Sequence, residues 1–150
     1  EGQVVKYLPF IKDGLMTNSI VDNDGEEHVI QIRGTGLWLG DLYSFFSGAK
    51  TKFNIQAYQA TELLMINHET FDYITKNHPV YEKFFRLNIQ EAYVQTLNRI
   101  YNLHSATAKE RYLELIKNIP DLLDKIPHYL IASYLNIKPQ SLSRIRKNLK

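Results

Sequence analysis

The chain has 150 residues, of which 44% are hydrophobic and 23% are charged, a composition that supports one or two small folded domains. Its 18 basic and 16 acidic residues nearly balance, so the overall charge indicates no particular partner. Cysteine is absent, which excludes disulfides, thiolate metal sites, cysteine-ligated iron–sulfur clusters and cysteine nucleophiles. No apolar run approaches the ~20 residues that cross a bilayer and no secretory signal opens the chain, so we expect a cytoplasmic protein without a membrane partner.

The first part of the chain has the pattern of antiparallel β structure. Short alternating or apolar runs occur at residues 4–11, 15–21, 28–32, 52–57 and 62–66. The segments KDG, NDG, GTG and SGA between them carry the Gly, Asn and Asp residues that turns require. Short helices are expected at residues 41–46 and 68–77. The second should end before Pro79, because a residue that precedes proline avoids helical geometry.

Residues 79–104 contain no helix breaker and predict one helix of about seven turns. Two apolar stripes with heptad spacing run along it. The first stripe is Ile89, Tyr93, Thr96, Ile100 and Leu103, and the second is Leu87, Val94, Leu97 and Tyr101. Two apolar faces need two surfaces to cover them. We expect one face to pack on the β structure, and the first stripe to pack against its copy in a homodimer. The alternative is a helix buried on both sides within one chain.

The last part of the chain has the pattern of a helix-turn-helix, which needs apolar residues where two short helices touch and a small residue where they cross. The inner positions are Ile131, Ala132, Leu135, Ile137, Leu142 and Ile145, with Ala132 at the crossing and Ile137 at the turn. Pro139 fits the first turn of the second helix, where its missing N–H costs nothing. Lys138 occupies the cap position, where a side-chain acceptor is usual, so DNA phosphate could supply the acceptor instead.

The outer face of the second helix carries side chains that suit DNA, namely Gln140, Ser141, Ser143, Arg144 and Lys147. The alternative is a helical hairpin with a solvated basic face. The charge distribution favours DNA, because all 16 acidic residues lie at or before Asp124. The first part carries 12 basic side chains against those 16, a net charge of −4, and the tail carries +6. A basic element on a mildly acidic body is the electrostatic footprint of phosphate binding.

The sequence contains no recognisable catalytic or metal-binding pattern. The histidines at positions 28, 68, 78, 104 and 128 show no metal-ligand spacing, and no nucleophile elbow or phosphate-binding loop occurs. Four acidic residues cluster in one predicted turn, at positions 22, 24, 26 and 27, where acids are usually solvated. We therefore expect that the protein is not an enzyme and has no metal.

The order of these parts resembles the Crp/Fnr family of transcription regulators over nearly the full length. The motifs that carry the resemblance are GLWLGDLYSFFSG, AKERYLELI and IASYLNIKPQSLSRIRK, in a form most similar to that of Bacteroidetes bacteria. The resemblance implies an α+β fold with an antiparallel β jelly roll as sensor (1–78), a long dimerisation helix (79–104) and a C-terminal helix-turn-helix domain (105–150). The chain opens at what resembles the middle of the roll, so we expect an N-terminally incomplete roll and a fragment of a longer protein.

The resemblance also implies an effector site around the family's phosphate-binding cassette. Gly40, Asp41 and Leu42 match its Gly-acid-Leu, whereas the Arg that neutralises a cyclic phosphate is missing. Thr51 stands at that position, flanked by Lys50 and Lys52, which lack the bidentate fork of a guanidinium. Thr96 matches the helix position that can touch a nucleotide base. Cyclic AMP is therefore disfavoured as the cofactor, and the alternatives are another small effector or none.

For DNA, the family's base-reading positions correspond to Pro139, Gln140 and Arg144. We assign Gln140 and Arg144 to bases, and Lys138, Ser141, Ser143 and Lys147 to phosphates. The expected partners are a palindromic double-stranded operator, a second copy of the chain and RNA polymerase. The competing hypothesis is a ligand-binding or protein-interaction module whose helical tail only packs.

Overall fold

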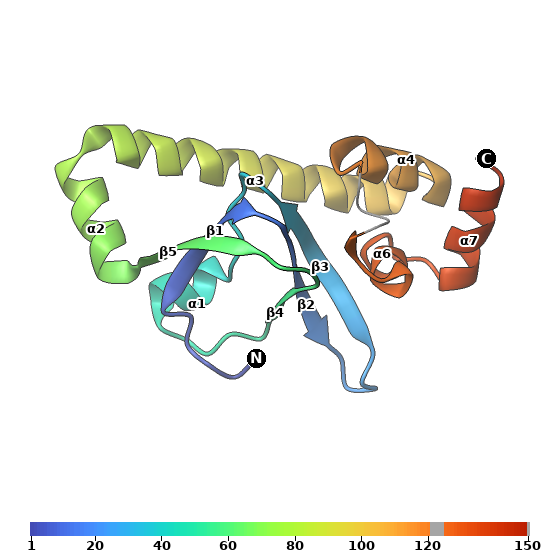
Figure 1. Ribbon diagram of the computed structural model, residues 1–150, viewed down its shortest axis with the longest axis horizontal. Coiled ribbons are helices and arrows are strands. Elements are labelled where there is room, and N and C mark those ends of the chain that lie inside the picture. The colour runs from blue at the N-terminus through green and yellow to red at the C-terminus, as the bar shows by residue number, and fades with distance from the viewer. Residues whose placement is uncertain (121–124, 150) are drawn as a thin grey trace.

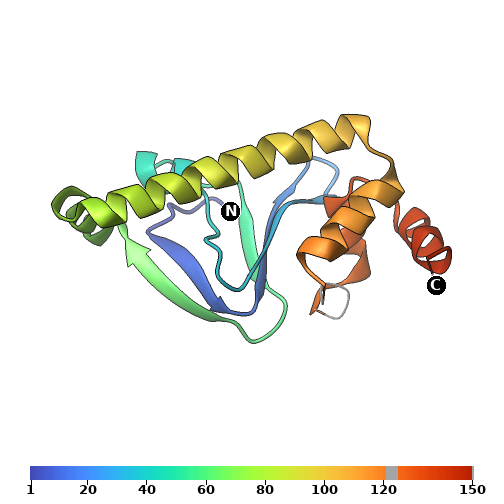
Figure 2. The same ribbon diagram turned by 90° about the horizontal axis from the view of Figure 1, so that it is seen from above.

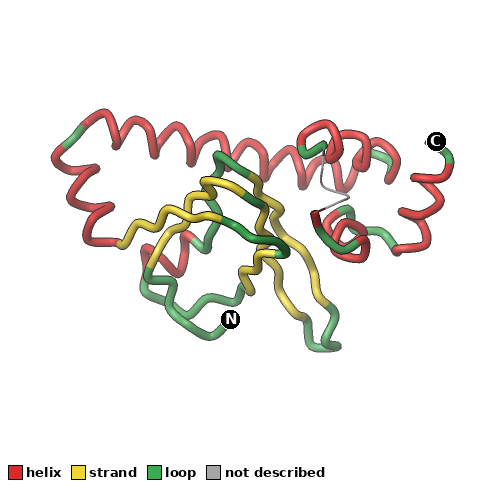
Figure 3. The backbone as a smooth tube through the Cα atoms, in the orientation of Figure 1, coloured by secondary structure: helices red, strands yellow, loops and turns green. Residues whose placement is uncertain are grey.

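The computed structural model describes residues 1–120 and 125–149. A β part with one short helix lies along one side of a long helix, α3 (Pro79–Ser105), as Figures 1 and 3 show. A group of short helices lies at the C-terminal end of α3, and α2 (His68–Asn77) lies at its other end (Figures 1 and 2). The mixed composition of helices and antiparallel strands confirms the expected α+β class.

The strands form two small antiparallel sheets. β1 (Tyr7–Asp13) pairs with β5 (Glu62–Asn67), and β2 (Leu15–Val21) lies between β3 (Glu27–Gly34) and β4 (Asn54–Ala57). Each predicted strand is present within a few residues of its expected bounds. The two sheets share no hydrogen-bonded strand pair among the described residues, so the expected jelly roll is not confirmed.

The core of the β part lies between these sheets and α3. One cluster joins Leu8 of β1 to Phe45, Phe71 and Phe85, which come from three different helices. The rings of Phe71 and Phe85 lie 4.7 Å apart, which makes α2 pack onto the first turns of α3. Gly40 allows the chain to pass close to β1, since a Cβ there would lie 2.8 Å from Leu8 Cδ1.

The helix bounds follow from local chemistry. α1 (Leu42–Ser47) is capped by Asp41 and α2 by Asn67, whose side chains accept the backbone N–H of the third helical residue. Pro79 begins α3 and prevents α2 from continuing into it. The predicted helix 79–104 is therefore confirmed, with one further residue at its C-terminal end.

Three described helices form the C-terminal part. α4 (Ala108–Asn118) begins with a capping box between Thr107 and Glu110, and α6 (His128–Tyr134) and α7 (Pro139–Lys147) follow. Their shared core continues into the sheet through Leu15, Val29 and Ile32 of β2 and β3. The division of the chain at residue 105 stays a prediction, because this hydrophobic core extends across it.

Ser133 joins α6 to the free edge of β3. Its hydroxyl accepts the backbone N–H of Val29 at 2.9 Å and donates to the carbonyl of Glu27, also at 2.9 Å. Among the described residues β3 pairs with β2 alone, so no strand lies on its other side to bond these groups. One side chain therefore takes the place of a strand partner and holds α6 against the sheet.

Candidate nucleic-acid interface

The two helices α6 and α7 are joined by a tight turn over residues 135–138. Asn136 has φ 52°, in the left-handed region that asparagine adopts more readily than most residues. Ile137 then donates its backbone N–H to the carbonyl of Ala132 at 3.0 Å, which closes the turn. The turn sets the direction of α7 relative to α6.

The predicted inner face is buried. Ile131, Ala132 and Leu142 have 0% exposure, and Leu135 has 2%. Ile137 and Ile145 are half-buried against the same cluster. The interior therefore fixes α7 through Leu142, while the opposite side of α7 takes no part in the core.

The outward face of α7 consists of the predicted DNA contacts. The structure places Lys138, Pro139, Gln140, Ser143, Arg144 and Lys147 at exposed positions, with Ser141 half-buried. Ser143 donates its hydroxyl to the carbonyl of Pro139 at 3.2 Å, within the helix itself. The side chains of Gln140 and Arg144 form neither a hydrogen bond nor an ion pair with the described part of the chain, and both point away from the core.

The electrostatics of this face favour an anion. Residues 138–147 contain four basic side chains and no acidic one: Lys138, Arg144, Arg146 and Lys147. The side chain of Lys138 makes no capping hydrogen bond, so it does not satisfy a backbone N–H in the first turn of α7. Burial and the charge of Arg146 lower the pKa of nearby His128 below its ordinary value. The basic side chains and the uncapped start of α7 suit contact with a phosphate backbone, whereas His128 stays neutral and adds no charge.

Two residues of the predicted phosphate-binding cassette, Asp41 and Thr51, bond to each other. Asp41 and Thr51 are both 7% exposed, and the Thr51 hydroxyl donates to Asp41 Oδ2 at 2.7 Å. Asp41 Oδ1 accepts the backbone N–H of Ser44 at 3.1 Å, and Thr51 Oγ1 accepts the N–H of Phe53 at 3.1 Å. Thr51 therefore occupies the predicted phosphate-neutralising position as a buried structural residue.

The structure brings Asp41 and Thr51 into contact, but the seven predicted effector residues do not line one common cavity. Gly40 and Leu42 line a cavity of about 120 Å³ beside Trp38 and Phe85. Lys50 and Lys52 are exposed on the surface, and Thr96 lines a different cleft. Thr96 donates its hydroxyl to the carbonyl of Ala92 at 2.8 Å, the usual bond of a helical threonine. 

The long helix presents both apolar stripes to the outside. In the first stripe Ile89, Tyr93 and Ile100 are 43%, 64% and 48% exposed, Thr96 is exposed and Leu103 is half-buried. Leu87, Val94, Leu97 and Tyr101 of the second are 47–69% exposed.

The expectation that one apolar stripe covers the β part is therefore wrong. The face that meets the β part runs through Phe85, Ala92 and Arg99 instead. Phe85 belongs to the aromatic cluster, Ala92 lines the same cavity as Gly40, and Arg99 donates to the carbonyl of Val29.

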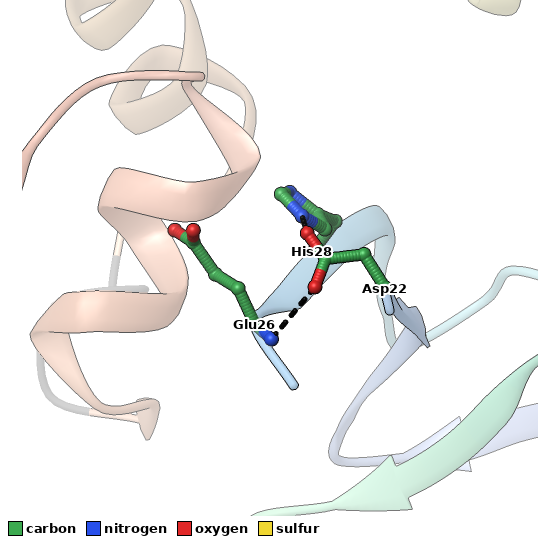
Figure 4. Close-up of side chains that lie close together, drawn as sticks. All are labelled: Asp22, Glu26 and His28. Atoms are coloured by element: carbon green, nitrogen blue, oxygen red, sulfur yellow. Dashed lines mark hydrogen bonds and ion pairs between the residues drawn. The ribbon is translucent and has the colours of Figure 1, made fainter. Parts of the chain in front are cut away.

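The acidic turn between β2 and β3 is organised by Asp22, as Figure 4 shows. Its Oδ1 accepts the backbone N–H groups of Asp24 and Glu26 at 3.0 and 2.9 Å, and its Oδ2 lies 2.7 Å from Nε2 of His28. The hydrogen bond to His28 lowers the pKa of Asp22, and the same bond raises the pKa of His28. Sequence reasoning missed this pair, although an Asp six residues before a His across an NDG turn is a usable signal.

Three half-buried arginines near the junction of β3, α3 and α4 were also missed. Arg33, Arg99 and Arg111 line one cleft although they are far apart in the sequence. Only the fold brings them together, so no local pattern could have predicted the cluster.

None of the helices in residues 1–120 and 125–149 combines the length and apolar character that a membrane span requires. No protein-family model and no curated protein matches the sequence.

Solved structures with a similar fold include proteins described as regulators. FixK2 from Bradyrhizobium japonicum has a TM-score of 0.83 at 14% identity, over 99% of this chain and 77% of that one. The c-di-GMP responsive global regulator CLP from Xanthomonas campestris has a TM-score of 0.69 at 15% identity, over 99% and 79%. A Eubacterium rectale protein described as a candidate regulator of the Crp/Fnr family has a TM-score of 0.69 at 16% identity, over 97% and 69%. The chain therefore shares the fold of these three proteins.

Proposed function

We propose that the chain is a sequence-specific, DNA-binding transcription regulator of the Crp/Fnr family that acts as a homodimer. The observation that carries the proposal is the exposed, acid-free face of α7 above the buried anchor Leu142. The competing hypothesis, a helical tail that only packs, does not explain why the outward face of α7 is basic and why its long side chains are unpaired in the described part of the chain. The similarity in fold to solved regulators supports the same conclusion.

In this proposal α7 enters the major groove of a double-stranded operator. Gln140 pairs with adenine and Arg144 with guanine, because these are the side chains that match the two bases bidentately. Lys138, Ser141, Ser143 and Lys147 hold phosphates, and the backbone N–H of Gln140 contacts the DNA backbone, because Pro139 has no N–H and that of Ser141 already donates to the carbonyl of Lys138. Pro139, which lacks a hydrogen-bonding side chain, makes the operator differ from those of relatives that have Arg there.

The proposed dimer forms through the exposed apolar side chains of α3, with a second copy as the occupant. Tyr93, Leu97 and Ile100 lie on one side of the helix and line neither the cavity beside Gly40 nor the cleft at Arg33. Ile89 lies at the edge of that side, where it also lines the cavity beside Gly40. Seven apolar side chains of the two stripes, with exposures of 43–69%, make an apolar area that monomers rarely leave uncovered. Two copies related by a twofold axis then impose a palindromic operator.

Regulation through the cassette by cyclic AMP stays disfavoured, because the Asp41 and Thr51 side chains are buried and bonded to each other. The effector, the contact with RNA polymerase and the cytoplasmic location are further parts of the proposal that follow from the regulator class. The Bacteroidetes form of the family is a prediction from the sequence motifs, to which the compared structures add no support.

The proposal is tested by selecting binding sites from a pool of random DNA duplexes and measuring affinity by fluorescence anisotropy. The selected site should be palindromic. Arg144→Ala should weaken binding by about 5- to 150-fold, the equivalent of ~1–3 kcal/mol, and relax the preference at one base pair per half-site. Lys76→Ala removes a charge on α2, at the end of the molecule remote from α7, and should leave the affinity unchanged. An Arg144→Ala variant that binds as tightly as the parent contradicts the proposal.

A further inference from the structure

A cleft of about 420 Å³ lies between β3, the C-terminal half of α3, α4 and α6. Its volume falls in the range of small-molecule sites, roughly 300–1,000 Å³. It adjoins the smaller cavity at Gly40 and shares Arg33 and Gln95 with it. Asp41, Thr51 and the two cassette lysines do not line it. The cleft is therefore a place for a ligand outside the cassette predicted from the sequence.

The charges that line the cleft are unbalanced. Arg33, Arg99 and Arg111 contribute three guanidinium groups, whereas Glu114 contributes the one carboxylate among the lining residues. Glu114 already accepts a hydrogen bond from Asn102 at 2.7 Å. Within the described ranges 1–120 and 125–149, none of the three arginines forms an ion pair. Partly buried cations without a counter-ion are costly, so the cleft favours an anion.

Arg33 extends from β3 into the cleft. Its one hydrogen bond there runs from Nη1 to Oε1 of Gln95 at 2.9 Å, and Gln95 is held in turn by Glu91. Burial lowers the pKa of Arg33, which reflects the cost of keeping this charge away from water. An amide oxygen satisfies one of its five N–H donors without neutralising the charge.

Arg99 and Arg111 connect the cleft to α6. Arg99 Nη2 donates to the carbonyls of Val29 and Tyr134, at 3.3 and 2.9 Å, and its guanidinium lies 4.4 Å from the centre of the Tyr134 ring. Arg111 donates to the carbonyl of Leu135 at 3.2 Å and to that of Ala106. Both Arg99 bonds come from Nη2, and its other N–H groups donate to no residue in the described part of the chain, so they are available to a ligand.

We propose that this cleft binds a small organic anion, carrying a carboxylate or phosphate group, between Arg33, Arg99 and Arg111. The bound group supplies the missing negative charge and forms the forked hydrogen bonds that guanidinium groups favour. Because Arg99 and Arg111 also hold the end of α6, the anion ties α6 to β3 and α3 and thereby sets the position of α7. This regulatory consequence rests on the proposed function, whereas the binding itself does not.

The test is an NMR titration of the 15N-labelled full chain with citrate and, separately, with inorganic pyrophosphate, at constant ionic strength. Saturable amide shifts are expected at the residues that line the cleft. Arg33→Gln should weaken binding about tenfold or more, since a charge-assisted hydrogen bond is lost. Asn98→Asp places a carboxylate at an exposed position of the lining and should weaken binding by repulsion, which keeps the test decisive should Arg33→Gln fold poorly. Arg86→Gln, on α3 but outside the cleft, and the double change of Lys50 and Lys52 to Gln should leave affinity unchanged.

Three results overturn the proposal: no saturable shift with either anion, unchanged affinity in both cleft variants, or saturable shifts confined to Lys50 and Lys52 or to α7. The titration contains no DNA. Failure of anion binding therefore leaves the DNA-binding proposal standing, and failure to bind DNA leaves the anion site standing.

Discussion

Replacing Ser133 by alanine should loosen α6 from the edge of β3. The change removes two hydrogen bonds of 2.9 Å, one from the Val29 N–H and one to the Glu27 carbonyl. Val29 is 2% exposed, so water can replace only part of what is lost. A buried donor without a partner costs ~1–3 kcal/mol, and we expect the free energy of unfolding to fall by about 2 kcal/mol in total. For a chain of this length that corresponds to a melting temperature lower by ~4–8 °C.

The assay is urea unfolding at 25 °C followed by circular dichroism, with the m-value checked to be unchanged. Ser143→Ala is the matched control, because that hydroxyl donates only within its own exposed helix. It should change the free energy of unfolding by less than ~0.5 kcal/mol. A Ser133→Ala variant as stable as the control refutes the view that this side chain fastens α6 to the sheet.

Three further outcomes are expected. The pKa of His28, followed by NMR, should lie above that of an unperturbed histidine and return toward it in Asp22→Asn. Because the folded pKa is raised, the pair stabilises the turn fully below the unfolded pKa, and this stabilisation is lost as pH rises through the folded pKa. An unshifted pKa of His28 in the parent contradicts the hydrogen bond to Asp22. Leu97→Glu should convert the dimer to monomer in sedimentation velocity, since it puts a charge into the apolar side of α3, and an intact dimer would place the interface elsewhere. Leu142→Ala should lower the free energy of unfolding by ~2–5 kcal/mol in urea, because Leu142 is fully buried, and a loss below ~1 kcal/mol would mean that α7 does not depend on this anchor.

Local signals predicted most of the secondary structure. Pro79 and the turn segments act on their immediate neighbours, so the bounds of α3 and of the strands follow from a few residues each. The outward face of α7 also follows from short-range periodicity, since Leu142 lies inside and Gln140 and Arg144 lie outside on a single helix.

The missed features depend on residues far apart in the sequence. Pairing of β1 with β5, docking of Ser133 on β3, and the bond between Asp41 and Thr51 each require the fold to be known. The two apolar stripes of α3 had no assignable partner, because apolar character alone does not identify which surface covers a helix. The face that packs on the β part contains an arginine and an alanine, residues that a search for apolar stripes passes over.

The central claim, that α7 lies against the phosphates and bases of DNA, is tested most directly by the salt dependence of operator affinity. The logarithm of the association constant is measured against the logarithm of NaCl concentration for the parent and for Lys147→Gln. A phosphate contact at Lys147 predicts weaker binding and a slope smaller in magnitude by ~1 in the variant, since one fewer counterion is released. A slope near zero for the parent, or identical lines for the two proteins, would contradict contact of this face with DNA.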